Sequence, residues 1–173
     1  EKAGDEYLAP FYNDYRFWIQ YQTYDVTQQL KPGENVLSVM LGDGWYKGRF
    51  SYLDEARVKE IYGDDFLLTA QLLITFGDGT RQMITTDETW KCISSPVLFS
   101  NIYDGEVYDA GREIWDRDAC RLAEGVEEAS VPAVRAAAPE GKLTERMSVP
   151  VRIHERFSPV CLLIPPAGEQ VLG

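Results

Sequence analysis

The stretch FLLTAQLLITFGDGTRQMITT, residues 66–86, decides the fold class of this chain. Every second residue from Phe66 to Phe76 is apolar, whereas the residues between them are mixed. A period of two places alternate side chains on one face of a strand, so the pattern predicts a strand with one buried face. The Gly-Asp-Gly sequence at 77–79 supplies a tight turn, and the more polar residues 80–86 return as the second strand of a hairpin.

Short apolar or alternating segments, separated by turn residues, continue on both sides of this hairpin. They are residues 15–21, 36–41, 90–93, 97–103, 149–153 and 160–164. The segment 36–41 is apolar almost throughout, which is typical of a strand covered on both faces. We therefore predict an all-β fold, a β-sandwich or jelly roll of antiparallel strands with long loops and little helix. We expect residues 1–145 to form this domain and residues 146–173 to be a connector with the first strands of a following β module.

The composition argues against several classes of partner. Among 173 residues, 17 are Lys or Arg and 28 are Asp or Glu, giving a formal net charge of −11. A chain this acidic repels phosphate backbones and anionic lipid surfaces, so we expect no nucleic acid and no membrane as partner. Cys92, Cys120 and Cys161 lie far apart and form no closely spaced pair of the kind that binds zinc. We expect these three cysteines to be reduced, which favours a cytoplasmic location over a periplasmic or secreted one.

A glycine-framed loop, LGDGWYKG at residues 41–48, is the first candidate binding segment. Its three glycines permit a sharp turn. Between them stand an acid, two adjacent aromatic residues and a cation, namely Asp43, Trp45, Tyr46 and Lys47. Aromatic faces beside polar groups are suited to holding a sugar ring, and these four residues are predicted carbohydrate contacts. The alternative is a turn whose tryptophan folds back onto the core.

The segment IYDGEVYDA, residues 102–110, is the second candidate. Tyr103 would supply a stacking face, and Asp104 and Glu106 would bind sugar hydroxyls or a calcium ion, which prefers oxygen ligands. The alternative is a structural turn or an interdomain contact. We predict no catalytic residue. With 28 acids some close carboxylate pair is nearly certain by chance, so such a pair is no evidence of catalysis. The single histidine, His154, has no evident catalytic partners.

Seven motifs in a fixed order resemble one known family. They are LAPFYNDY (8–15), YQTYDVT (21–27), GENVLSVMLG (33–42), TDETWK (86–91), IYDGEVYDA (102–110), GKL (141–143) and PVRIHE (150–155). In this order and spacing the set resembles the N-terminal non-catalytic region of bacterial α-L-rhamnosidases of glycoside hydrolase family 78. The chain departs from the family pattern at residues 11–13, and again at Gly111, which intervenes before Arg112.

The resemblance implies a larger enzyme that hydrolyses terminal α-L-rhamnose from glycosides or polysaccharides. Its catalytic (α/α)6 barrel would lie beyond Gly173, so the chain itself would lack the catalytic domain. The β domain would support that barrel and contact rhamnose-containing carbohydrate. Some sugar-binding modules associated with the family use calcium, which raises the expectation of a calcium ion here. Two alternatives remain: a calcium-dependent rhamnose-binding module, and a purely structural interdomain β-sandwich.

Overall fold

The computed structural model describes residues 1–49, 61–113, 115, 116, 121, 122 and 129–161. Within these ranges the chain forms twelve strands and one short 3-10 turn, η1 (Ala110–Arg112), and no α-helix. The prediction of an all-β fold with little helix is confirmed. Over the same ranges, no helix is long and apolar enough to cross a bilayer.

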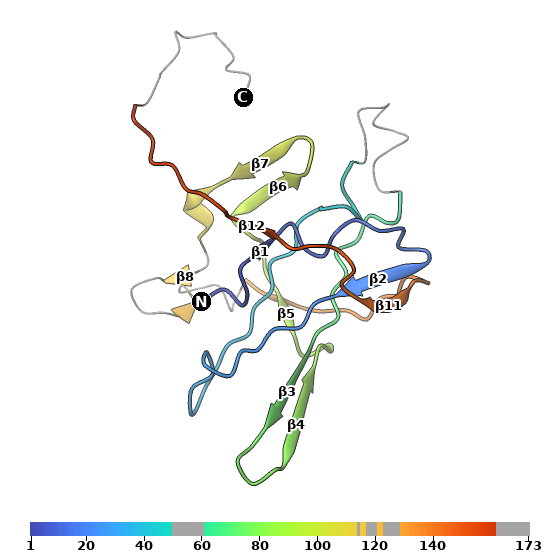
Figure 1. The fold of residues 1–173 in the computed structure, drawn as a ribbon, viewed down its shortest axis with the longest axis vertical. Coiled ribbons are helices and arrows are strands. Elements are labelled where there is room, and N and C mark those ends of the chain that lie inside the picture. Colours follow the sequence, from blue (N-terminus) through green and yellow to red (C-terminus); the bar gives the residue numbers. More distant parts are fainter. Residues whose placement is uncertain (50–60, 114, 117–120, 123–128, 162–173) are drawn as a thin grey trace.

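The strands are short, and each pairs with one neighbour (Figure 1). Their bounds are β1 (Glu6–Tyr7), β2 (Trp18–Tyr21), β3 (Gln71–Thr75), β4 (Arg81–Thr85), β5 (Lys91–Cys92), β6 (Val97–Asn101), β7 (Gly105–Tyr108), β8 (Trp115–Asp116), β9 (Arg121–Leu122), β10 (Val131–Pro132), β11 (Lys142–Glu145) and β12 (Val151–Arg152). Three pairs join sequence neighbours, β3–β4, β6–β7 and β8–β9. The other three, β1–β12, β2–β11 and β5–β10, tie distant segments together.

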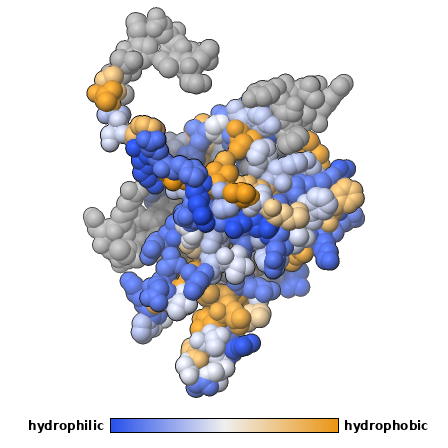
Figure 2. Space-filling view, viewed as in Figure 1, coloured by the Kyte–Doolittle hydropathy of each residue, from blue (hydrophilic) through white to orange (hydrophobic). Residues whose placement is uncertain are grey.

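The predicted hairpin is confirmed as β3–β4, but its first strand begins at Gln71 and not at Phe66. The predicted buried face is wrong, because Phe66, Leu68 and Phe76 are 50%, 38% and 47% exposed. Leu73 lies opposite Met83 in the antiparallel register. The Phe76 amide donates to the Thr80 carbonyl at 2.9 Å, and Gly79 takes a positive φ of 85° to close the turn. The hairpin projects from the rest of the domain in Figure 1, and Figure 2 shows apolar side chains gathered over it.

One distant pair corrects the expectation of purely antiparallel strands. β2 and β11 run parallel, with Trp18 opposite Lys142 and Tyr21 opposite Glu145. A Cβ on Gly141 would lie 2.5 Å from the Tyr15 carbonyl oxygen, so glycine is needed where the chain enters this pair. Because parallel strands end at the same edge, Tyr21 and Glu145 become neighbours. Closure of the strand pairs into a sandwich or jelly roll stays a prediction.

The prediction of a doubly covered strand at residues 36–41 is wrong. These residues form no strand, and their backbone has no ladder partner among the described residues. A strand exists only where a second chain segment accepts its hydrogen bonds, and apolar composition alone does not provide one. The side chains are accordingly exposed, with Val36 at 60%, Leu37 at 51% and Met40 at 59%. Most of the segment 160–164, another predicted strand, lies outside the described residues.

The core of the described domain is small and partly polar. Tyr15 is its buried aromatic residue, 7% exposed, and Asn13 and Gln20 are buried beside it at 5% and 6%. Asn13 Nδ2 donates to the Trp18 carbonyl at 2.6 Å, and Gln20 Oε1 accepts from the Met147 amide at 2.9 Å. The buried amides therefore satisfy backbone groups on both sides of the β2 region.

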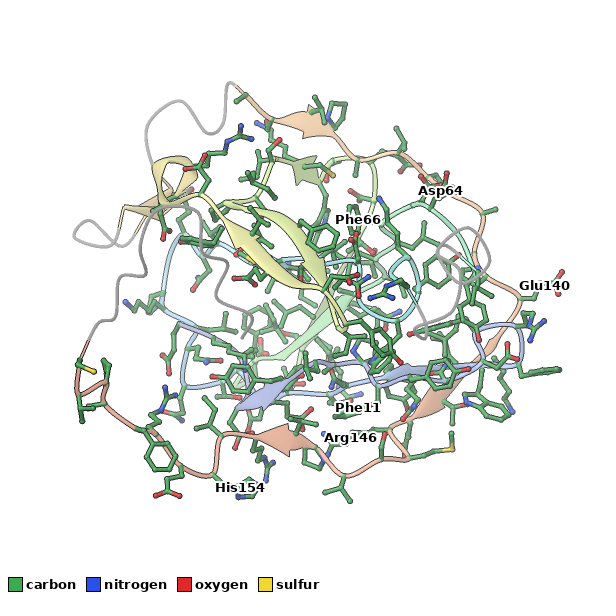
Figure 3. All side chains as sticks on the ribbon, turned by 90° about the horizontal axis from the view of Figure 1, so that it is seen from above. Phe11, Asp64, Phe66, Glu140, Arg146 and His154 are labelled. Carbon is green, nitrogen blue, oxygen red and sulfur yellow. The ribbon has the colours of Figure 1, made fainter. Side chains whose placement is uncertain are left out.

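Residues after the predicted boundary contact the first residues of the chain. β12 pairs with β1, and Arg146 forms an ion pair with Glu6. The boundary near Arg146 stays a prediction, but residues 146–152 belong with the domain body in these contacts. Figure 3 shows His154 farther along, at the periphery of the molecule, and its side chain is exposed.

Candidate functional site

The glycine-framed loop closes on itself. The amides of Lys47 and Gly48 both donate to the Asp43 carbonyl, at 3.1 and 3.2 Å. Gly44 takes a positive φ of 52°. Gly48 is buried, and a Cβ on it would lie 2.4 Å from the Gly44 carbonyl oxygen and 3.0 Å from Asn101 Nδ2. The loop therefore requires glycine at position 48, and its end lies against the β6–β7 turn.

An arginine that the sequence analysis did not single out joins the two candidate segments. Arg49 Nε donates to Asp104 Oδ2 at 3.1 Å, and a second guanidinium nitrogen donates to Asp104 Oδ1. The Arg49 guanidinium carbon lies 5.5 Å from the centre of the Tyr103 ring. Asn101 Oδ1 accepts from the Tyr103 amide at 2.9 Å and shapes the same turn. Segments more than fifty residues apart in sequence are thus held side by side by a two-pronged ion pair.

The aromatic residues of the loop contact a tyrosine cluster. Trp45 meets Tyr12 edge-on with ring centres 5.8 Å apart. Tyr46 meets Tyr15 at 5.2 Å and stacks near Tyr62 at 6.2 Å. Edge-to-face and offset contacts of this kind are favourable arrangements of aromatic rings. Trp45, Tyr46 and Tyr103 are all half-buried. None of the three rings is fully buried in the core, and none is fully exposed for stacking against a sugar.

The cluster also changes the acidity of its phenols. Burial raises the pKa of Tyr15 from 10.0 to about 12. Burial, followed by the hydrogen bond to the Tyr12 hydroxyl at 3.2 Å, also raises the pKa of Tyr62. Both phenols stay neutral at physiological pH, so the cluster presents rings and hydroxyls and no additional charge.

Lys47 and Glu106 stand apart from the centre of this arrangement. The Lys47 ammonium lies 4.2 Å from the centre of the Phe66 ring, which directs it toward the segment that precedes β3. Glu106 lies on β7 opposite Ser100 and is exposed, whereas Asp104 belongs to the preceding turn. Asp109, from the same acidic segment, accepts from the Gly111 amide at 2.9 Å and begins η1.

The predicted calcium ligands Asp104 and Glu106 differ in their surroundings. Both carboxylate oxygens of Asp104 accept hydrogen bonds from the Arg49 guanidinium, so a positive charge already lies beside this acid. In the described part of the chain, no three His, Cys, Asp or Glu side chains gather in a way that could hold a metal. Calcium binding at Asp104 and Glu106 remains an untested prediction that would require Arg49 to move.

Three partners of the site, Arg49, Tyr12 and Tyr62, are not predicted by the sequence patterns. The burial of Tyr15 is indicated by the sequence, because Tyr15 begins the alternating segment 15–21. No sequence pattern indicates the contacts of Tyr12 and Tyr62, because each lies in an irregular segment where periodicity does not predict a facing partner. Arg49 follows Gly48 directly, but only the fold shows that Asp104 is its counterion.

Comparisons with known proteins all match this chain to α-L-rhamnosidases. The family model described as the α-L-rhamnosidase N-terminal domain matches residues 1–155. An α-L-rhamnosidase from Streptomyces avermitilis is 34% identical over 174 residues, which cover 99% of this chain and 16% of that protein. The chain thus spans about one sixth of that relative's length.

Solved structures agree with the sequence matches. The crystal structure of the Streptomyces avermitilis α-L-rhamnosidase complexed with L-rhamnose superposes with a TM-score of 0.76 at 33% identity, over 88% of this chain and 14% of that one. The native enzyme from Aspergillus terreus gives a TM-score of 0.73 at 31% identity, over 87% of this chain and 17% of that one.

Proposed function

Because the chain belongs to the α-L-rhamnosidase N-terminal domain family, we propose that it is a non-catalytic accessory domain of an α-L-rhamnosidase and contacts carbohydrate through its loop–turn site. We define the loop–turn site as residues 43–49 with residues 101–106. The parent enzyme would hydrolyse terminal α-L-rhamnose from glycosides or polysaccharides, using a catalytic domain elsewhere in the same protein. The chain would bind sugar without cleaving it.

The observation that supports the carbohydrate contact is the bridge from Arg49 to Asp104. It places the end of the loop, Gly48 and Arg49, beside the turn that carries Tyr103 and Asp104. Half-buried aromatic rings next to carboxylates and amides offer both the apolar and the hydrogen-bonding surface that a pyranose needs. A shallow site of this kind is expected to bind a monosaccharide with a Kd on the order of 1 mM.

Titration of L-rhamnose into the chain, followed by 15N–1H NMR, tests this proposal. We expect saturable shifts at the amides of residues 43–49 and 101–106, with no hydrolysis of an aryl α-L-rhamnoside by the chain alone. Trp45→Ala and Tyr103→Ala should weaken binding, and Trp45→Phe should restore part of it because a ring remains. Phe157→Ala is the control, because Phe157 is 82% exposed and lies outside the site.

The titration is run with calcium and again with chelator. Binding that persists in chelator agrees with the Arg49–Asp104 pair, and binding that disappears supports the calcium-dependent module instead. Shifts absent from the loop–turn site at saturating rhamnose would refute the carbohydrate contact. Hydrolysis of the rhamnoside by the purified chain would refute the non-catalytic role, provided that controls exclude a contaminating enzyme.

A second role, interdomain support, is favoured by a separate observation. Large apolar side chains are exposed on two separate segments, the stretch 36–41 and the projecting hairpin. Leu73 and Met83, which face each other across the hairpin, are 55% and 59% exposed. Contiguous exposed apolar surface is typical of an interface. We infer that other domains of the parent enzyme cover part of this surface.

A further inference from the structure

A cleft lies at the end of the β2–β11 pair opposite Gly141. It has a volume of about 560 Å³, within the range of about 300–1,000 Å³ that is usual for small-molecule sites. Tyr21 and Glu145 end the two parallel strands and open directly onto it. β1 and β12 supply another wall through Glu6 and Arg152, which are opposite each other in register.

The floor of this cleft is a connected set of hydrogen bonds. The side chain of Glu6 is only 7% exposed and forms an ion pair with Arg146. Gln22 Nε2 donates to the other Glu6 oxygen at 2.8 Å, and the Tyr24 hydroxyl donates to Gln22 Oε1 at 2.9 Å. Each member is therefore oriented by its neighbour, so the polar groups are fixed before any ligand arrives.

The rim combines exposed rings with accessible charges. Tyr21 and Tyr24 are 42% and 36% exposed. The Tyr21 hydroxyl donates to Glu145 Oε1 at 3.4 Å, a long contact that leaves the carboxylate capacity to accept from a ligand. Gly4 allows the Tyr24 ring to approach the backbone, because a Cβ there would lie 2.3 Å from a ring carbon.

The chemistry of the lining selects the class of ligand. Four carboxylates and two guanidinium groups give the lining a net charge of −2, which disfavours an anion. In the described part of the chain no three acidic, His or Cys groups gather as a metal site, which disfavours a metal ion. The floor is too polar for an apolar ligand. A neutral ligand with several hydroxyl groups and one apolar face fits both the rings and the network.

We propose that this cleft, lined by Tyr21, Tyr24, Glu145 and Arg146, binds a neutral pyranose. Tyr21 supplies the apolar surface, and Glu145 and Arg146 bind ring hydroxyls. The site is distinct from the loop–turn site, shares no residue with it and does not depend on the proposed function. It would give the domain a second carbohydrate contact, next to its first and last strands.

NMR titration of the intact chain with L-rhamnose and, separately, with D-glucose tests the proposal. We expect at least one of these sugars to shift the amides of residues 22–24 and 145–146 in a saturable way, with a Kd on the order of 1 mM. Tyr21→Ala should weaken this binding about tenfold or more and Glu145→Gln about threefold or more. Tyr21→Phe should retain most of it because the ring remains.

The matched control is Tyr108→Ala, which truncates a tyrosine of similar exposure on β7 and should leave the cleft shifts unchanged. Retained dispersion of the other amides shows that each variant is folded. Spermidine and sulfate are titrated as a cation and an anion. Shifts at residues 22–24 with either of these and with neither sugar would overturn the proposal, as would no response to any probe.

The two sugar sites fail separately in this experiment. Rhamnose shifts confined to residues 43–49 and 101–106 would overturn the cleft and leave the proposed function standing. Shifts confined to residues 22–24 and 145–146 would support the cleft and refute the carbohydrate contact at the loop–turn site.

Discussion

Replacement of Tyr15 by alanine removes the ring on which the aromatic cluster converges. Tyr15 is 7% exposed and meets Tyr46 and Tyr62 edge-on, at 5.2 and 5.0 Å. A buried aromatic side chain removes about 150–250 Å² from water, which at about 25 cal/mol per Å² corresponds to about 4–6 kcal/mol as an upper bound. Measured losses for truncation of a buried aromatic residue are about 3–5 kcal/mol. We expect Tyr15→Ala to lower the free energy of unfolding by about 3–5 kcal/mol.

The assay is urea unfolding followed by the fluorescence of the four tryptophans. With a slope of about 2 kcal/mol per molar urea, the expected loss moves the midpoint down by about 2 M. Phe17→Ala is the matched control, because Phe17 lies two residues away and is 64% exposed. It should cost less than about 1 kcal/mol. A loss below about 1 kcal/mol for Tyr15→Ala, or an equal loss for both variants, would refute the view that this cluster forms the core.

Three further predictions concern the same region. Gly48→Ala places a Cβ 2.4 Å from a loop carbonyl oxygen and should lower the free energy of unfolding by about 1–3 kcal/mol, as measured by urea unfolding. Gly77→Ala is the control and should be close to neutral, because a Cβ there has no neighbouring atom within 4 Å. Arg49→Ala should lower the free energy of unfolding by about 1 kcal/mol through loss of the ion pair with Asp104. This difference from wild type should shrink as the salt concentration is raised from about 0.01 M to about 1 M, and equal stability of the two proteins at low salt would show that the pair contributes nothing. The pKa of Tyr15 is raised to about 12, so its contribution to stability is complete below pH 10 and is lost as the pH rises through about 12. Tyr15→Phe should therefore flatten the decline in unfolding midpoint above about pH 10, and an unchanged decline would contradict this assignment.

Local signals predicted the hairpin well and distant pairing poorly. Residues 66–86 contain both an alternating pattern and a Gly-Asp-Gly turn, so the hairpin depends on neighbours in sequence. The parallel pairing of β2 with β11 depends on a return of more than 120 residues, and no local pattern specifies the direction of such a return. The segment 36–41 shows the converse error, because an apolar run was interpreted as a strand without knowledge of a partner.

The candidate site was predicted by residue type but not by arrangement. Glycine spacing identified the loop, and the structure places its end against the β6–β7 turn, which carries Tyr103 and Asp104. The directions of Trp45 and Tyr46 depend on Tyr12 and Tyr62, which lie in irregular segments. Buried amides were also missed, because polar residues are mostly exposed and are buried only when local partners satisfy them.

The two proposed roles of the domain differ in how strongly they should stabilise it. A sugar present at ten times its Kd adds about 1.4 kcal/mol to the free energy of unfolding. Covering about 400 Å² of apolar surface adds about 10 kcal/mol before the cost of ordering is subtracted. Hydrogen exchange of the hairpin amides should therefore slow only slightly when saturating rhamnose is added to the chain, but by several orders of magnitude within the parent enzyme. Equal protection in the chain and in the enzyme would mean that no other domain covers Leu73 and Met83, and interdomain support would then have to depend on another surface.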